Sequence, residues 1–265
     1  MQSVNLRPAS GLPLKLEGHR LIFGAGMKKV APEARMRERM MAVLKNPASH
    51  APNDFYYMYR DVCMKKDAGK IKAAKLRYDI TVLPAFSVGD ELNKTFGHYH
   101  PMVPGTKTWY PEVYEVLHGR AHYLLQNGKE FLVFDAREGD KCVMLPGFGH
   151  ITINPFFSSS SSSSSPSSSQ KETLVMANWV YPGFASDYGP IEKLGGAQWY
   201  ETAKGFVENH HYVVVPGIKL VEPKEFPEFG LTKRPLYTEG VKNPKKFEWL
   251  SKPQHFEDSF RRYRE

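Results

Sequence analysis

Residues 111–154 read PEVYEVLHGRAHYLLQNGKEFLVFDAREGDKCVMLPGFGHITIN, a succession of short apolar segments separated by glycines. Within each segment apolar and polar residues alternate, which is typical of β-strands. Asn127-Gly128 between two of these segments is a strong signal for a tight hairpin turn. Many short strands at spacings of roughly 8–12 residues predict a β-sandwich or barrel, most simply a jelly roll.

The same pattern extends on both sides of this stretch. We expect strands at residues 55–62, 75–84, 91–98, 113–117, 121–126, 130–135, 141–145, 150–154 and 173–180. Residues 158–165 are an unbroken serine run, within a polar segment that ends at Gln170. Because this segment has no apolar side chains to bury, we expect residues 158–170 to form a mobile surface loop.

The two flanks have a different composition. Residues 32–45 are mostly helix formers with a methionine-rich apolar stripe, which predicts a helix, whereas residues 1–30 predict loop and one strand. After the strand-rich region we expect a short helix within 190–205, a strand at 212–215 and a wrapping tail that ends in a short helix. We therefore predict an N-terminal extension at 1–50, a β-domain at 51–193 and a C-terminal extension at 194–265 packed on it.

The charge and the cysteine content limit the possible partners and cellular location of the protein. The net charge of +8 favours anionic partners such as phosphorylated metabolites. The positive residues are spread along the sequence and not packed into one arm, so we expect no nucleic-acid partner. Cys63 and Cys142 form no CxxC pair, which predicts free thiols in a reduced compartment. Without a long apolar run or a secretory signal, the sequence predicts a cytoplasmic protein with no membrane partner.

Four polar side chains in the strand-rich region have the types and spacing of metal ligands. Residues two apart on a strand point to the same face, so His98 and His100 project together. Glu112 and His150 complete a set of three imidazoles and one carboxylate. This donor set suits a divalent ion such as Fe, Mn, Ni, Co or Zn. We therefore predict a metalloenzyme that holds one such ion per chain, while His122, His210 and His211 are structural.

These ligands lie in two motifs that resemble those of the cupin superfamily, whose fold is a double-stranded β-helix or jelly roll. The first motif comprises His98, His100, Glu112 and Gly119, and the second comprises Gly139, Pro146, His150 and Asn154. The interval from His100 to Glu112 is longer than usual for this superfamily, and the interval from Pro146 to His150 is one residue shorter. We expect the longer interval to form a loop near the metal, where a substrate contact can sit.

A more specific resemblance rests on Thr95-Phe-Gly-His-Tyr-His100, Pro111-Glu-Val-Tyr-Glu-Val-Leu-His-Gly119 and Ala185-Ser-Asp-Tyr-Gly189. Over residues 52–193 the chain resembles the cupin-type glucose-6-phosphate isomerases of archaea and some bacteria. This resemblance implies an isomerase that interconverts glucose 6-phosphate and fructose 6-phosphate in glycolysis and gluconeogenesis. It also implies that His98, His100, Glu112 and His150 bind the metal, with iron as the first candidate.

The resemblance further implies a phosphate subsite made of hydroxyls and a backbone amide, at Tyr56, Thr81, Thr95 and Gly97. Such groups can donate hydrogen bonds to a phosphate without carrying a fixed charge. The alternatives are that Thr81 is an ordinary strand residue and that Tyr56 is a core or rim aromatic. Gly97 can instead be needed for close backbone packing beside the metal.

The implied catalytic residues are Glu112, Tyr114 and Tyr188. Tyr114 shares the face of Glu112 and can bond to it, bond to the substrate or fill the barrel. Tyr188 matches a site tyrosine of the family, but the residue two before it, commonly histidine there, is Ser186 here. Glu112 can move a proton between C2 and C1 through an enediol. A direct hydride shift, with the metal holding both sugar oxygens, is the alternative route.

Two other functions use the same ligand set, a metal-dependent cupin dioxygenase and a non-catalytic cupin that binds sugar or metal. The hydroxyls suited to phosphate and the Asp187-Tyr188-Gly189 match favour the isomerase. We also expect a homodimer, because open sheet edges invite pairing between chains.

Overall fold

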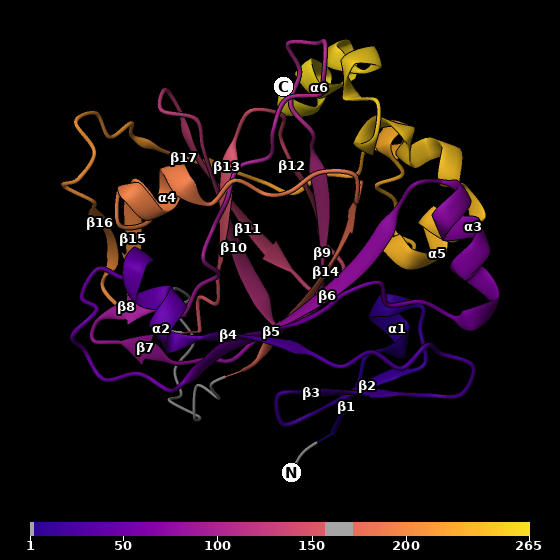
Figure 1. The fold of residues 1–265 in the computed structure, drawn as a ribbon, viewed down its shortest axis with the longest axis horizontal. Coiled ribbons are helices and arrows are strands. Elements are labelled where there is room, and N and C mark those ends of the chain that lie inside the picture. The colour runs from indigo at the N-terminus through magenta and orange to yellow at the C-terminus, as the bar shows by residue number, and fades with distance from the viewer. Residues whose placement is uncertain (1–2, 157–171) are drawn as a thin grey trace, which may run out of the picture.

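The computed structural model describes residues 3–156 and 172–265 (Figure 1), so the predicted serine loop at 158–170 lies outside the described residues. Two mainly antiparallel sheets form the centre of the molecule. The first has the order β12-β9-β14-β6-β5-β4 and comprises β4 (Glu33–Met36), β5 (Asp54–Tyr59), β6 (Arg77–Leu83), β9 (Glu112–His118), β12 (Lys141–Met144) and β14 (Leu174–Val180). The second has the order β13-β10-β11-β17 and comprises β10 (Arg120–Gln126), β11 (Phe131–Arg137), β13 (Gly149–Ile153) and β17 (Ile218–Val221).

The order of these strands is that of a jelly roll. One sheet places β6, β14, β9 and β12 side by side, and the other places β13, β10 and β11 side by side. The segment before β9 adds to the second sheet, because Lys94 and His98 pair with Ile153 and His150 of β13. The predicted all-β jelly roll is therefore confirmed. The strands predicted between residues 55 and 180 are present, with 91–98 reduced to the short β8 (Glu91–Leu92) and isolated bridges.

Smaller elements surround this core. Two further sheets comprise β1 (Ser3–Asn5), β2 (Leu14–Glu17) and β3 (Arg20–Phe23), and β7 (Ser87–Val88), β8, β15 (Trp199–Thr202) and β16 (Gly205–Glu208). The α-helices are α1 (Arg7–Ser10), α2 (Arg37–Met40), α3 (Ala68–Ala73), α4 (Gly189–Lys193), α5 (Leu236–Lys242) and α6 (Glu257–Arg264). The 3₁₀ helices are η1 (Met41–Val43), η2 (Lys65–Asp67), η3 (Pro227–Phe229), η4 (Pro244–Leu250) and η5 (Pro253–His255).

Helices α5 and η4 pack against β14 on the outer face of the six-stranded sheet (Figure 1). Trp179 of β14 donates its indole N–H to the carbonyl of Leu236 at 2.9 Å and stacks on Tyr237. Glu115 of β9, also on this face, accepts the amide of Leu236 at 2.9 Å and pairs with Lys141 at 2.9 Å. Strands β9 and β14 are thus buried on both faces, which explains why β14 is more continuously apolar than a half-exposed strand. The division of the chain at residues 51 and 193 stays a prediction.

Three local predictions were wrong. The helix predicted at 32–45 is a strand, β4, followed by α2 and η1, because residues 33–36 gain more by pairing with β5 than their helix propensity offers. The strand predicted at 212–215 is absent from this described segment, and Val213 there is fully exposed. Residues 1–30 form a three-stranded sheet with α1, where we expected loop and one strand. The predicted short helices near 190 and at the C-terminus are present as α4 and α6.

Both cysteines are free, as predicted, and both are buried. Among the helices of the described residues, none has the length and apolar character needed to span a bilayer.

Candidate metal centre

The four predicted metal ligands come from three segments of the jelly roll. His98 and His100 lie on the segment that precedes β9, Glu112 begins β9, and His150 lies on β13. His98 and His150 exchange two backbone hydrogen bonds, of 3.2 Å and 3.0 Å, so the two side chains lie opposite each other on one face. The register between these two segments therefore brings together histidines that are far apart in sequence.

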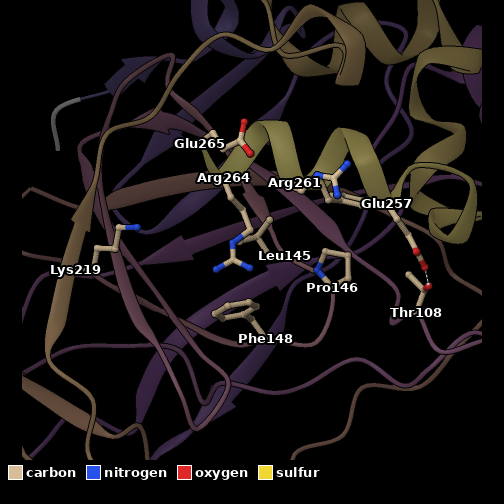
Figure 2. A pocket seen from close by; sticks show the side chains of 10 residues that line it. Thr108, Leu145, Pro146, Phe148, Lys219, Glu257, Arg261, Arg264 and Glu265 are labelled. Carbon is tan, nitrogen blue, oxygen red and sulfur yellow. Dashed lines mark hydrogen bonds between the residues drawn. The ribbon is translucent and has the colours of Figure 1, made fainter.

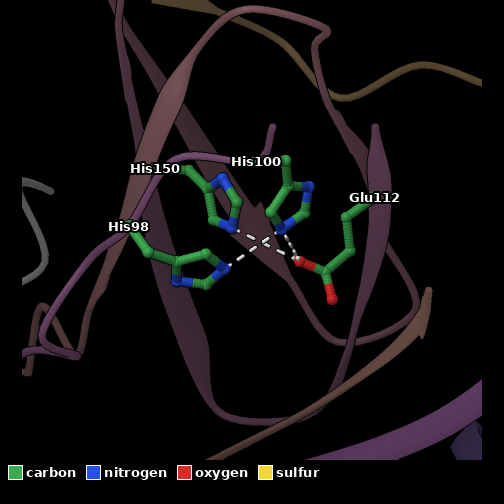
Figure 3. A group of neighbouring side chains, drawn as sticks. All are labelled: His98, His100, Glu112 and His150. Atoms are coloured by element: carbon green, nitrogen blue, oxygen red, sulfur yellow. Dashed lines mark hydrogen bonds and ion pairs between the residues drawn. The ribbon is translucent and has the colours of Figure 1, made fainter. Parts of the chain in front are cut away.

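The four side chains converge on one point inside the barrel (Figure 3). One ligand atom from each residue lies within 4.8 Å of all the others. The Nε2 atoms of His98 and His100 are 3.1 Å apart. Glu112 Oε2 lies 3.6 Å from His100 Nε2 and 3.3 Å from His150 Nε2. This is the donor set that a divalent ion of the Fe, Mn, Ni, Co or Zn type accepts.

Two imidazoles of the cluster, His98 and His100, and the carboxylate of Glu112 have the protonation that metal binding requires. Burial lowers the pKa of His98 well below its ordinary value, and the neighbouring histidines lower it further. Burial also lowers the pKa of His100 to about 4, against the opposing effect of Glu112. Burial would raise the pKa of Glu112, but His150 and His100 lower it overall. Two neutral imidazoles and an ionised carboxylate are thus ready to donate lone pairs to a cation at neutral pH.

One observation shows that these residues fit a metal ion. Neither ring nitrogen of the buried His150 makes a hydrogen bond among the described residues, although Nε2 lies 3.3 Å from Glu112 Oε2. An unpaired buried nitrogen is unfavourable, and a coordinated cation would satisfy it. The carboxylate and imidazole donors facing His150 Nε2 are spaced for the same ion.

Neighbouring groups fix the orientation of two ligands. The Nδ1 atom of His100 lies 3.0 Å from the carbonyl oxygen of Tyr110, which leaves Nε2 directed at the centre, and Phe184 packs against its ring at 4.5 Å. Asn178 of β14 donates to Glu112 Oε1 at 2.5 Å, and the Tyr114 hydroxyl donates to Oε2 at 3.2 Å. Groups behind the ligands commonly set their orientation and basicity in this way.

The bond of Tyr114 to Glu112 was one of three alternatives that the sequence left open. Sequence reasoning missed Asn178, Tyr110 and Phe184. Tyr110 lies in the long interval that was expected to form a loop near the metal. Asn178 falls in a segment recognised only as a strand, and its position opposite Tyr114 follows from the pairing of β14 with β9. The sequence signal available was an amide within an otherwise apolar strand.

The residues predicted for the phosphate lie on β5, on β6 and on the segment that leads into His98. Tyr56 is buried on β5, and its hydroxyl oxygen accepts the amide of Phe96 at 3.3 Å. Thr81 lies on β6, opposite Met58 of β5. The Thr95 hydroxyl oxygen accepts the amide of Thr152 at 2.9 Å.

Gly97 has a steric reason to be glycine. Its φ of +83° is unfavourable for other residues, and a Cβ atom there would lie 2.5 Å from Ile151 Cγ1. Close packing beside the metal ligands therefore accounts for Gly97, whether or not its amide also meets a substrate.

Tyr188 closes the same side of the cluster. Its ring lies 5.4 Å from the ring of His98 and 5.4 Å from that of Phe96. The segment is held by reciprocal backbone hydrogen bonds of 2.8 Å between Tyr99 and Asp187. Ser186 stands where the resembling family commonly has histidine, so the described residues around Tyr188 offer no further imidazole from this position.

Arg35 is the main charged group that sequence reasoning missed. Its Nε donates to the Tyr56 hydroxyl at 3.2 Å, and its guanidinium lies 5.7 Å from the centre of the Tyr188 ring. The side chain is half-buried, and no carboxylate pairs with it in the described part of the chain. Nothing in the sequence indicated that Arg35 lies near the site, because residues 32–45 were predicted to form a helix. As a strand opposite β5, the same residues place Arg35 directly across from Tyr56.

A separate cavity of about 520 Å³ lies beneath α6 (Figure 2). Arg264 lies over the Phe148 ring there, and Thr108 bonds to Glu257. None of the predicted site residues lines this cavity.

Comparisons with known proteins show the family to which most of the chain is similar. A family model described as glucose-6-phosphate isomerase (GPI) matches residues 34–214, which is more than half of the chain. No curated protein matches the chain.

Similar solved structures include vicilin from Corylus avellana (hazelnut), at 14% identity and a TM-score of 0.33, covering 52% of this chain and 30% of that one. Oxalate oxidase in complex with the substrate analogue glycolate is 12% identical, with a TM-score of 0.29 and coverage of 44% and 47%. AerE from Microcystis aeruginosa is 11% identical, with a TM-score of 0.29 and coverage of 60% and 46%. The match spans less than half the length of each of these chains, and likenesses this weak carry no conclusion about function.

The lowered pKa of His100 predicts how the chelator-treated protein responds to acid. In the unfolded chain His100 takes up a proton near its ordinary pKa of 6.5, whereas in the folded protein it does so near pH 4. Between these values the unfolded state binds more protons, so stability falls as pH falls. From pH 7.5 to pH 5 we expect His100 alone to account for a loss of about 2 kcal/mol.

Urea unfolding at the two pH values measures this loss. His100→Gln should show a smaller acid-dependent loss than the unmodified chain. An identical loss in both proteins would contradict the assignment.

The hydrogen bond from Asn178 predicts a second measurable effect. Asn178→Leu removes the donor that fixes Glu112 Oε1, so we expect metal affinity to fall about 10- to 100-fold. Competition with a chromogenic chelator measures the affinity. Asn209→Leu is the matched control, since Asn209 is also a buried amide but bonds to the carbonyls of Leu194 and Ala197. It should lower stability and leave metal affinity unchanged; equal affinities in all three proteins would refute the role of Asn178.

Proposed function

The chain belongs to the glucose-6-phosphate isomerase family, and we propose that it is a metal-dependent aldose–ketose isomerase that interconverts glucose 6-phosphate and fructose 6-phosphate. The observation that supports this proposal most directly is the convergence of His98, His100, Glu112 and His150 within the matched region. Iron is the first candidate for the ion, with Mn, Ni, Co and Zn as alternatives. We place the enzyme in the cytoplasm, in glycolysis and gluconeogenesis.

A divalent ion bound by these four residues would supply Lewis acidity toward the sugar oxygens. The protein orients the reacting end of the sugar between this centre and the aromatic wall of Tyr188 and Phe96. Tyr188 is half-buried beside His98, so its hydroxyl is the catalytic group we assign to contact the sugar.

Glu112 and Tyr114 act together in this proposal. Burial raises the pKa of Tyr114 well above its ordinary value, so its hydroxyl stays protonated and donates to Glu112 Oε2. Oε1 accepts from Asn178, so both carboxylate oxygens are held. For Glu112 to move the proton between C2 and C1, one of these bonds must loosen. Deuterium from solvent at C2 of recovered substrate would support this route, and its complete absence would support the hydride shift.

The phosphate end of the sugar lies, in our proposal, at Tyr56, Thr81, Thr95 and Gly97, with Arg35 as the counter-charge. The Tyr56 hydroxyl oxygen accepts hydrogen bonds from Phe96 and Arg35, so its own proton remains to be donated. A half-buried guanidinium without a carboxylate partner among the described residues favours an anion at this point. Sequence reasoning expected an uncharged phosphate subsite, and Arg35 adds a fixed charge to it.

We also retain the proposal of a homodimer, with neither nucleic acid nor membrane as a partner. Strand β17 is the last strand of its sheet, and its Leu220 is 73% exposed. An open strand edge with an exposed apolar side chain is suited to pairing with a second copy. Light scattering during size-exclusion chromatography gives the oligomeric state.

A coupled assay tests the activity itself. Purified protein is assayed for glucose 6-phosphate formation from fructose 6-phosphate as isolated, after chelation, and after addition of each candidate divalent ion. We expect activity to vanish with the chelator and to return with at least one ion. Oxygen consumption is measured in parallel, because a dioxygenase uses the same ligands. Bound metal with no isomerisation under any condition would overturn the proposal in favour of an oxygenase or a binding protein.

The position of Arg35 gives a prediction about substrate binding. Arg35→Gln removes the charge near the phosphate, and a hydrogen bond to a charged group is worth about 1.5–3 kcal/mol. We therefore expect KM for fructose 6-phosphate to rise about 10- to 100-fold with a smaller change in kcat. Arg137→Gln, at the exposed end of β11, is the control and should leave both constants unchanged. If Arg35→Gln behaves like this control, Arg35 does not meet the phosphate.

A further inference from the structure

A second open groove, of about 680 Å³, lies between α3 and η4, and none of the four metal ligands lines it. Figure 1 shows α3 beside the C-terminal elements that include α5. Four of the five charged side chains that line the groove are lysines: Lys70, Lys75, Lys245 and Lys252, with Glu248 as the fifth. A volume of this size is in the range of small-molecule sites.

The two segments that form the groove carry an unusual share of the protein's charge. Residues 65–75 and 242–252 together contain nine lysines and two acids, an excess of seven positive charges. The net charge of the whole chain is +8. In the sequence these segments are far apart, and so the charge looked dispersed. The fold brings the two segments together through contacts of α3 with α5, and four of their lysines line the groove.

Most lysines lining the groove are not neutralised. Lys252 pairs with Glu248 at 2.6 Å, whereas Lys70, Lys75 and Lys245 have no ion-pair partner within the described residues. Like charges gathered around one cavity repel each other and raise its positive potential. An anion in the groove would relieve this repulsion and bridge lysines from two different parts of the chain.

We propose that this groove is a binding site for a small anion that carries more than one phosphate group. Lysine ammonium groups bind phosphate as point charges on flexible stems, and several of them around one cavity suit several phosphates. Binding of a nucleic-acid strand generally adds aromatic side chains on which bases stack. The groove has one aromatic residue, Tyr181, among the residues that line it, so its chemistry favours a small phosphorylated molecule.

The groove lies on the outer side of the wall around the metal centre. Tyr181 lines the groove, and its ring lies 5.2 Å from that of Tyr110 and 6.3 Å from that of Phe184. Phe184 packs on His100. The anion site is therefore separate from the phosphate subsite at Arg35 and Tyr56, yet it adjoins the aromatic residues that support a metal ligand.

Isothermal titration of the full-length protein with inorganic pyrophosphate at 150 mM salt tests this assignment. The metal content is measured before and after, so that extraction of an ion is recognised. The test variant is the triple substitution Lys70→Ala, Lys75→Ala and Lys245→Ala. The matched control, Lys15→Ala, Lys129→Ala and Lys204→Ala, removes the same charge from elsewhere on the surface. A further variant, Arg35→Gln, tests whether pyrophosphate binds instead at the proposed sugar-phosphate subsite.

We expect the groove variant to bind pyrophosphate at least tenfold more weakly, with the control and Arg35→Gln within about twofold of the unmodified protein. Equal weakening by the control would show that net charge alone attracts the anion and would overturn the site. Loss of binding in Arg35→Gln only would place the anion at the proposed sugar-phosphate subsite and overturn the groove site. Absence of pyrophosphate binding would also refute a small-anion site. So would a single-stranded oligonucleotide that binds more tightly than pyrophosphate and loses this binding in the groove variant. None of these outcomes depends on isomerase activity.

Discussion

The pair of backbone hydrogen bonds between His98 and His150 is the constraint on which the site depends. It joins the segment before β9 to β13 and fixes which side chains of the two segments share a face. A shift of one residue would turn the imidazoles to the opposite face. Gly97 permits this close approach, because any Cβ there would collide with Ile151.

This arrangement gathers nitrogen and oxygen ligands inside an apolar barrel, where burial keeps two of the imidazoles neutral. In water the same groups would be partly protonated and mobile. In the barrel they are held by backbone pairing, by the carbonyl of Tyr110 and by the donors to Glu112. Neither ring nitrogen of His150 makes a hydrogen bond among the described residues, and a cation bound by Nε2, which lies 3.3 Å from Glu112 Oε2, would offset part of that cost.

Most of the β-core could be predicted from the sequence, because alternation of apolar residues and turn glycines is a local signal. Strand β4 could not, since residues 33–36 are good helix formers and become a strand only by pairing with β5. Because of this error, Arg35 was not identified from the sequence as the charged residue that lies beside Tyr56. Asn178 was missed for a related reason, since its contact with Glu112 exists only through the register of β14 with β9.

The sequence by itself determined the kind of chemistry available: the spacing of His98 and His100, the later Glu112 and His150, and the glycines and turns of a jelly roll. These features are local, because strand periodicity and ligand type need no knowledge of distant partners. The tertiary structure alone decided which groups support the ligands, where Arg35 stands, and that lysines from residues 65–75 and 242–252 surround one groove. Long-range strand pairing and packing set these positions, and neither is encoded in the spacing of neighbouring residues.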